Sequence, residues 1–139
     1  MRRVRIELDG TVAIAVLHED GAPRTAARLW DALPIEGTLR HVRWSGEAGY
    51  IMSPALAGEN GEPERPVSFY PPGGIVLRSE HGELAFAYGQ SQARDNLRIA
   101  DRGCHVASIE TNGAEFLERV AATGRGGGRP IRLAREVEG

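Results

Sequence analysis

The side chains best suited to bind a small molecule are aromatic, basic and hydrogen-bonding residues in the middle and second half of the chain. Aromatic rings supply flat apolar walls, and a guanidinium can hold a carboxylate through two parallel hydrogen bonds. Such a mixture suits a planar or amide-bearing small molecule that carries a carboxylate. The candidate ligand-binding residues are Arg43, Trp44, Glu47, Tyr50, Tyr88, Gln90, Arg94 and His105.

Two other interpretations of this set remain open. Its aromatic residues could pack in the core while its arginines are solvated surface charges. The set could also form an active site, in which Glu47 or His105 is the general base. Arg43 or Arg94 would then hold a carboxylate of the substrate. The sequence therefore leaves open whether the protein is an enzyme.

Metal and nucleophile chemistry is not favoured by the spacing of the histidines and the cysteine. None of the histidine spacings is HxH or HxxxH, so we expect no metal site and no cofactor. Cys104 precedes His105, but neighbours in a strand point to opposite faces, which favours a buried thiol over a nucleophile. The four histidines are His18, His41, His81 and His105.

Length and charge limit the partners of the protein. The chain has 139 residues, a formal net charge of −2 and one cysteine. Its length predicts a single domain over residues 1–139, with a core that needs no disulfide or metal. The charge gives no reason to expect nucleic acid as a partner, and no apolar run is long enough to span a membrane. The lone cysteine and the lack of an apolar signal segment favour a cytoplasmic protein.

Two strands and a helix are predicted near the N-terminus. Apolar residues alternate over residues 4–8 and 12–16, and the Asp-Gly pair between them is typical of a two-residue hairpin turn. Pro23 suits the first turn of a helix, where its missing N–H group is not needed. Apolar residues recur at helical spacing from there to Leu33, and the following proline ends the helix.

Six further strands follow, most of them joined as hairpins. Alternating apolar and small residues mark the strands, and Gly, Pro and polar residues mark the turns. Residues 54–68 show no periodicity and are predicted to be a surface loop, whereas residues 89–103 are polar and Arg-rich and are predicted to arch over an opening. The six predicted strands are 38–44, 49–53, 75–78, 83–88, 105–110 and 131–137.

A second helix is predicted to begin after Asn112. Asn112 and Glu115 have the spacing of a capping box, an apolar stripe follows, and Gly124 is typical of a helix end. Two helices and about eight strands joined as hairpins favour a mainly β fold with no parallel crossover. The predicted architecture is a closed antiparallel eight-stranded β-barrel capped by two α-helices.

The order of these elements resembles a cyclophilin. In that family a strand pair leads through an Ala-Pro-basic-Thr sequence into a helix, and a Gly-Thr strand that carries a His comes next. The resemblance implies a cyclophilin-like barrel, with the strand ends that carry the candidate ligand-binding residues converging on one side. The matching residues are Ala22, Pro23, Arg24, Thr25, Leu29 or Trp30, Leu33, Gly37, Thr38 and His41.

The residues that cyclophilins use for prolyl isomerisation are replaced in this chain. Carried over by position, the family's catalytic Arg falls on Val42, and a Phe falls on Glu47. The family's Gln and a second Phe fall on Val106 and Ser108. We therefore expect no prolyl isomerase activity, and residual isomerase activity is kept only as a second alternative.

A group of small bacterial cyclophilin-like proteins of unknown function is similar in two further motifs. Their Tyr-Pro-x-x-Gly strand entry matches Tyr70, Pro71 and Gly74, and their Tyr-Gly hairpin end matches Tyr88-Gly89. This resemblance implies, by analogy, a pocket at the place where cyclophilins bind their peptide.

The function predicted from these patterns is the binding of a small anionic or amide-bearing metabolite. The first alternative is an enzyme or enzyme subunit that acts on cyclic amide or ureido compounds. An exposed strand edge near residues 50–53 and the Pro-rich loop after it favour a homodimer, because a symmetric contact would cover them.

Overall fold

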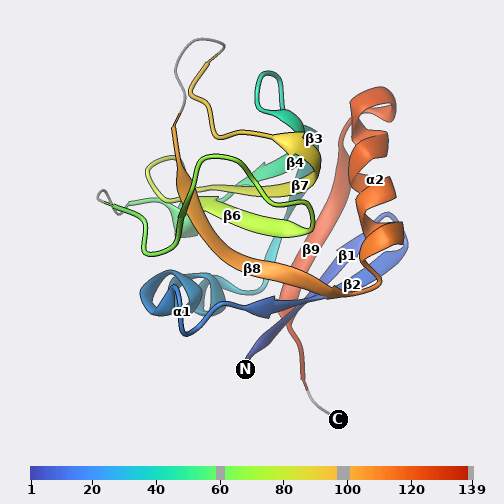
Figure 1. Ribbon diagram of the computed structural model, residues 1–139. Coiled ribbons are helices and arrows are strands. Elements are labelled where there is room, and N and C mark those ends of the chain that lie inside the picture. Colours follow the sequence, from blue (N-terminus) through green and yellow to red (C-terminus); the bar gives the residue numbers. More distant parts are fainter. Residues whose placement is uncertain (59–61, 97–100, 138–139) are drawn as a thin grey trace.

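Eight antiparallel strands close into a barrel in the computed structural model, which describes residues 1–58, 62–96 and 101–137 (Figure 1). These strands are β1 (Arg3–Leu8), β2 (Thr11–Leu17), β3 (Ile35–His41), β4 (Gly46–Met52), β6 (Gly74–Arg78), β7 (Glu83–Ser91), β8 (Gly103–Thr111) and β9 (Arg129–Arg135). Around the barrel their order is β2-β1-β9-β3-β4-β7-β6-β8, and pairing of β8 with β2 closes it. Every strand pair between described residues is antiparallel, so the predicted barrel is confirmed.

The boundaries of β3 differ from the prediction in a way that matters for the site. The strand begins at Ile35 because residues 35–39 pair with β9. It ends at His41, so Arg43 and Trp44 lie in the β3–β4 loop and not in a strand. A loop position frees both side chains from strict strand alternation.

The two predicted surface loops are shorter than expected. The first contains a 3₁₀ helix, η1 (Pro54–Leu56), and a short strand, β5 (Pro66–Val67), which pairs with the start of β8. The second is shortened because β7 and β8 both extend beyond their predicted ends. Residues 59–61 and 97–100 of these predicted loops lie outside the described residues.

Helix α1 (Pro23–Ala32) begins at the predicted proline. It ends one residue before the predicted end, because Leu33 is its C-cap. Ala26 and Leu29 are its buried residues, and they pack into the core. α1 and α2 (Gly113–Gly126) lie on opposite sides of the barrel (Figure 1). In the described part of the chain, neither helix has the length and apolarity that crossing a membrane requires.

The start of α2 lacks the predicted capping box. Asn112 precedes the helix in a left-handed conformation, with φ 60°, and its side-chain amide donates to the carbonyl of Val12. Glu115 accepts a hydrogen bond from the hydroxyl of Thr11. Both side chains therefore tie the helix to β2, and the helix continues past its predicted end.

The β6–β7 hairpin carries apolar side chains on both of its faces. Leu84 and Phe86 join the core inside the barrel, where Phe86 meets Phe116 of α2 edge to face with ring centres 5.9 Å apart. The intervening residues of β7 face outward and are small. They belong to a second, outer cluster, which consists of Tyr70, Val76, Ala85, Ala87 and Ala93. Small side chains on this outer face leave room for a groove.

Candidate functional site

A groove beside the β3–β4 loop has two parts. The aromatic hollow has a volume of about 890 Å³, and residues that line it include Trp44, Glu47, Phe69, Tyr70, Gln90 and Ser91. The charged hollow has a volume of about 430 Å³, and residues that line it include Arg43, Tyr50, Met52, Arg78, His81 and Glu83. Because Trp44, Ser45 and Arg94 line both, the two hollows adjoin one another.

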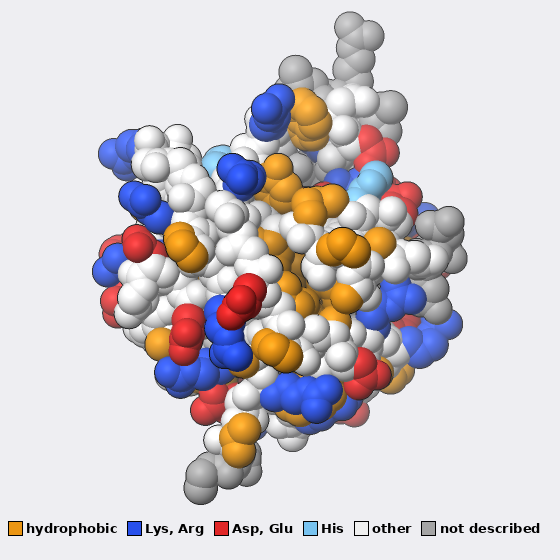
Figure 2. Space-filling model, turned by 180° about the vertical axis from the view of Figure 1, so that it is seen from behind, with side chains coloured by type: hydrophobic (Ala, Val, Ile, Leu, Met, Phe, Trp, Pro, Cys, Tyr) orange, Lys and Arg blue, Asp and Glu red, His pale blue; other side chains and the backbone are white. Residues whose placement is uncertain are grey.

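Large hydrophobic side chains are exposed around this groove. Trp44 is 39% exposed, Met52 55% and Phe69 73%. The only other described large hydrophobic residues that are exposed lie near the two chain ends. The space-filling view shows hydrophobic side chains gathered near the middle of one face, with charged side chains around them (Figure 2). Exposed apolar groups that gather at a hollow are typical of a binding surface.

Two polar atoms beneath the aromatic hollow lack partners. The hydroxyls of Tyr70 and Ser91 are buried and form no hydrogen bond with any described residue. Tyr70 is 3% exposed, and burial raises the pKa of its phenol well above the ordinary value. A buried hydroxyl without a partner costs free energy, so these two hydroxyls are unsatisfied polar groups in residues that line the hollow.

Six of the eight candidate ligand-binding residues line the groove. Trp44, Glu47, Gln90 and Arg94 lie at the aromatic hollow, and Arg43, Tyr50, Trp44 and Arg94 lie at the charged hollow.

The polar members of this set differ in how they are engaged. Glu47 accepts a hydrogen bond of 2.9 Å from the backbone N–H of Gln90, and Arg94 donates to the side-chain carbonyl of Gln92 at 2.8 Å. The guanidinium of Arg43 forms no hydrogen bond or ion pair with a described residue. Arg43 is therefore the member best placed to hold an incoming anion.

Tyr88 lies on the opposite face of β7 from the groove. It packs against the interior core, and its hydroxyl lies 2.7 Å from Nε2 of His41. Strand alternation explains this, because Tyr88 shares its face with Leu84 and Phe86.

His105 also lies outside both hollows. It is 9% exposed, its Nε2 lies 3.1 Å from the hydroxyl of Ser108, and its ring contacts that of His18. Burial is the main cause that lowers the pKa of His105 to about 4, and the charges of His18 and Arg65 contribute to the same shift. The imidazole is therefore neutral at neutral pH, but it does not face the groove as a general base.

The low pKa of His105 makes the stability of the protein depend on pH. In the unfolded chain this histidine has its ordinary pKa of 6.5, so the unfolded chain binds the proton more tightly than the folded protein does. The stabilisation is fully present above pH 6.5 and is lost as the pH falls through about 4. The loss should reach about 2–4 kcal/mol. Denaturant unfolding at several pH values should show a flatter profile for His105→Gln, and equal slopes for variant and parent would contradict the assignment.

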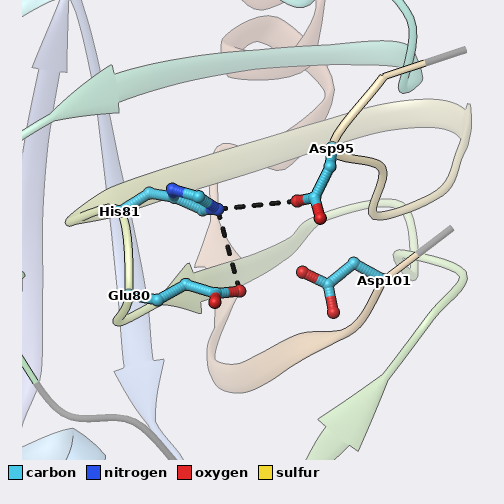
Figure 3. Close-up of side chains that lie close together, drawn as sticks. All are labelled: Glu80, His81, Asp95 and Asp101. Atoms are coloured by element: carbon cyan, nitrogen blue, oxygen red, sulfur yellow. Dashed lines mark ion pairs between the residues drawn. The ribbon is translucent and has the colours of Figure 1, made fainter. Parts of the chain in front are cut away.

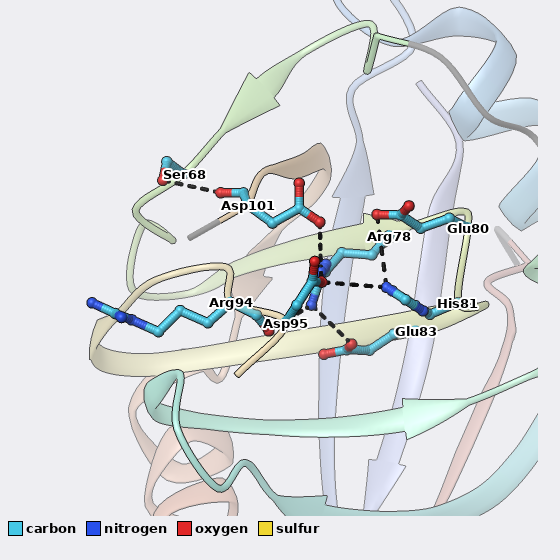
Figure 4. Close-up of polar contacts among 8 residues, drawn as sticks. All are labelled: Ser68, Arg78, Glu80, His81, Glu83, Arg94, Asp95 and Asp101. Carbon is cyan, nitrogen blue, oxygen red and sulfur yellow. Dashed lines mark hydrogen bonds and ion pairs between the residues drawn. The ribbon is translucent and has the colours of Figure 1, made fainter. Parts of the chain in front are cut away.

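Sequence reasoning missed the most heavily engaged side chain of the groove, Arg78. Its side chain is 3% exposed and forms an ion pair with Asp95, a 2.6 Å hydrogen bond to Asp101 and a 3.0 Å hydrogen bond to the carbonyl of Arg94. Glu83 pairs with Arg78 across the β6–β7 ladder, and its Oε2 lies 3.5 Å from Nη1 of Arg78 (Figure 4). The predicted hairpin already placed Arg78 and Glu83 beside the same turn, which is the signal that could have found the pair.

Glu83 is the carboxylate of the charged hollow with the most protected environment. Its side chain is 15% exposed, and burial raises its pKa above the ordinary value although Arg78 lowers it. A largely buried carboxyl group with a raised pKa beside a hollow is suited to proton transfer.

A cluster of carboxylates and one imidazole at the edge of the groove could coordinate a divalent cation. Potential ligand atoms of Glu80, His81, Asp95 and Asp101 all lie within 4.8 Å of one another (Figure 3). Sequence spacing did not reveal this cluster, because its members come from two segments that are separated along the chain. Arg78 already binds Asp95 and Asp101, and its charge offsets theirs. The cluster is therefore an ion-pair network centred on Arg78.

Solved structures that share this fold include the following two. McbB, solved in complex with tryptophan, superposes with a TM-score of 0.72 and 22% identity over 98% of this chain. This chain spans 45% of the length of that McbB chain. The hypothetical protein AF2241 from Archaeoglobus fulgidus superposes with a TM-score of 0.68 and 19% identity, over 97% of this chain and 95% of that one.

A search of curated proteins finds no match to this chain. The model of one protein family matches residues 4–135, and that family is described as a protein of unknown function, DUF3830. The match extends over nearly the whole chain, and the protein therefore belongs to the DUF3830 family.

Proposed function

We propose that this protein binds a small, flat molecule that carries a carboxylate or an amide group, and that the molecule enters the groove beside the β3–β4 loop. The observation that carries the proposal is the aromatic hollow, which lies between exposed Trp44 and Phe69 and above two buried hydroxyls without partners.

The apolar part of the groove would supply most of the affinity. Covering about 100 Å² of apolar surface on the two rings contributes roughly 2.5 kcal/mol. Trp44 and Phe69 come from separate segments but line the same hollow, so a flat molecule in that hollow can contact both rings. Aromatic ligands stack on such rings with additional stabilisation of about 1 kcal/mol.

The polar part of the groove would set the orientation of the molecule. Arg43 offers a guanidinium with no described partner, and it lines the hollow next to Trp44. The hydroxyls of Tyr70 and Ser91 can serve an amide group, because a hydroxyl both donates and accepts. McbB has the same fold and was solved with tryptophan, an aromatic molecule with a carboxylate, which supports this class of ligand.

The cyclophilin-like resemblance agrees with a binding role without isomerase chemistry. Val42 stands where the resemblance expects the catalytic Arg, and Val106 is fully buried in the core. We propose that the protein is cytoplasmic and needs no cofactor. Its net charge of −2 supports the proposal that neither nucleic acid nor a membrane is its partner. The homodimer stays a prediction.

A second candidate function is an enzyme that acts on a cyclic amide or ureido compound. Glu83 favours it, because this carboxylate is largely buried, has a raised pKa and lines the charged hollow. Glu83 is a better general base than the two sequence candidates, since Glu47 is exposed and His105 faces elsewhere.

Calorimetric titration with hippurate, which combines a benzene ring, an amide and a carboxylate, tests the binding proposal. Arg43→Gln should weaken binding about tenfold, and Trp44→Ala should weaken it at least as much. Arg40→Gln is the matched control, because Arg40 is exposed on the neighbouring strand and lines neither hollow.

Equal affinities of Arg43→Gln and Arg40→Gln for hippurate would contradict the proposal, and so would the absence of any heat of binding. A parallel incubation with 5-benzylhydantoin separates the two candidate functions. Consumption of the hydantoin by the parent but not by Glu83→Gln would favour the enzyme.

A further inference from the structure

Two imidazoles and a hydroxyl meet at a point outside the groove. The hydroxyl of Ser108 lies 2.8 Å from Nε2 of His18 and 3.1 Å from Nε2 of His105. The two rings meet edge to face with centres 4.6 Å apart. His18 directly follows β2, while His105 and Ser108 lie on β8, so the β2–β8 closure of the barrel brings the three together.

The three residues differ in their exposure. His18 and Ser108 are partly exposed, whereas His105 is almost buried. Gly74 lies against the inner ring, since a Cβ at this position would stand 3.0 Å from Nε2 of His105. A larger residue at position 74 would therefore crowd the imidazole.

Arg65 adds a positive charge to this cluster. Its carbonyl accepts the backbone N–H of His105 at 2.9 Å, and its guanidinium crosses the turn after His18, where a Cβ on Gly21 would stand 2.8 Å from Nη1. The charge of Arg65 contributes to lowering the pKa of both imidazoles, after the effect of burial.

No carboxylate among the described residues neutralises Arg65. The neighbouring Glu64 accepts hydrogen bonds from Arg24 and Thr25, and Glu19 is paired with Arg2. Asp20 lies in the same turn as Gly21 but forms no ion pair with Arg65. The cluster therefore combines two imidazoles and a hydroxyl, which share hydrogen bonds, with a positive charge that no described carboxylate offsets.

The sign of this charge decides which ligand the cluster fits. A metal cation would be repelled by Arg65 and would find no carboxylate ligand there among the described residues. An oxyanion would gain from the guanidinium, from the Ser108 hydroxyl and from imidazole N–H groups. We propose that His18, Ser108, His105 and Arg65 form a binding site for a tetrahedral oxyanion, such as the phosphate or sulfate group of a small molecule.

Binding of an anion here should be tighter at lower pH. The groups that face the two imidazoles are each other, Ser108 and Arg65, and none of them is an acid. A bound anion would therefore favour the protonated imidazoles, which then donate to it. Sulfate is a suitable probe, because its own charge does not change near neutral pH.

NMR titration of the four imidazole signals with sulfate, against chloride at equal ionic strength, tests the site. Sulfate should raise the apparent pKa of His18 and His105, and it should leave the signals of His41 and His81 in place. Its affinity should rise about tenfold between roughly pH 7 and pH 5. Arg65→Gln should weaken sulfate binding about tenfold, and Arg102→Gln, which removes an exposed and ion-paired arginine, should not.

Equal effects of sulfate and chloride on the His18 and His105 signals would overturn the proposal. A response of these two signals to Zn²⁺ but not to sulfate would also overturn it. Circular dichroism of each variant shows whether it is folded, and Ser108→Ala provides a second variant that keeps all charges. Because the site lies outside the groove, the hippurate titration can succeed or fail independently of this result.

Discussion

Replacement of Arg78 by Met is expected to lower the free energy of unfolding by about 3–5 kcal/mol. The guanidinium is the shared partner of Asp95, Asp101 and Glu83, and its side chain is 3% exposed. Methionine has a similar length but no charge, so the three carboxylates would repel one another without compensation. Urea unfolding followed by circular dichroism measures the loss.

Two comparisons make the Arg78 result specific. Arg132→Met removes an ion pair with Glu36 in which both side chains are exposed, and it should cost less than about 1 kcal/mol. The deficit of Arg78→Met should also shrink as the pH falls, because protonation of the carboxylates relieves their repulsion. A cost for Arg78→Met as small as that for Arg132→Met would contradict the network.

Phe116→Ala is expected to cost about 3–5 kcal/mol of unfolding free energy. Phe116 is fully buried where α2 meets the barrel, and it contacts Phe86 edge to face. Its removal leaves a cavity that the rigid strands cannot collapse to fill.

Phe69→Ala is the matched control for Phe116→Ala. Phe69 is 73% exposed at the aromatic hollow, so its truncation should change stability by less than about 0.5 kcal/mol. Similar costs for the two variants, measured by the same urea unfolding, would contradict the assignment of Phe69 to the surface and Phe116 to the core.

The barrel could be predicted from the sequence because its signals are local. Alternation over residues 4–8 and 12–16 matches β1 and β2, and Pro23 starts α1 as the pattern predicted. The capping box at Asn112 was wrong because its spacing does not distinguish a cap from a tertiary contact. Asn112 donates to Val12 in β2, which is distant in sequence.

The candidate site could be predicted only in part. Trp44 and Arg43 reach the groove from a loop that was expected to be a strand. Tyr88 does not line the groove, because strand alternation in β7 places its side chain on the core side. His105 misses it because β8 places this residue beside β2, and sequence spacing does not report which strands close a barrel.

The residues that sequence reasoning missed are defined by long-range contacts. Phe69 resembles an ordinary core residue in the sequence, and only its exposure reveals that it is a wall of the aromatic hollow. Arg78 looks like a surface charge at the end of a strand, although Asp95 and Asp101 cover it from a distant segment.

The two tryptophan indole signals in a ¹H–¹⁵N spectrum give the most direct test of the binding groove. Trp44 is a wall of the aromatic hollow, whereas Trp30 lies elsewhere, with the guanidinium groups of Arg2 and Arg135 5.1 Å and 4.9 Å from its ring centre. Titration with hippurate should move the Trp44 indole signal in a saturable way and leave the Trp30 signal in place. Movement of neither signal, or of both equally, would contradict a binding site in the groove.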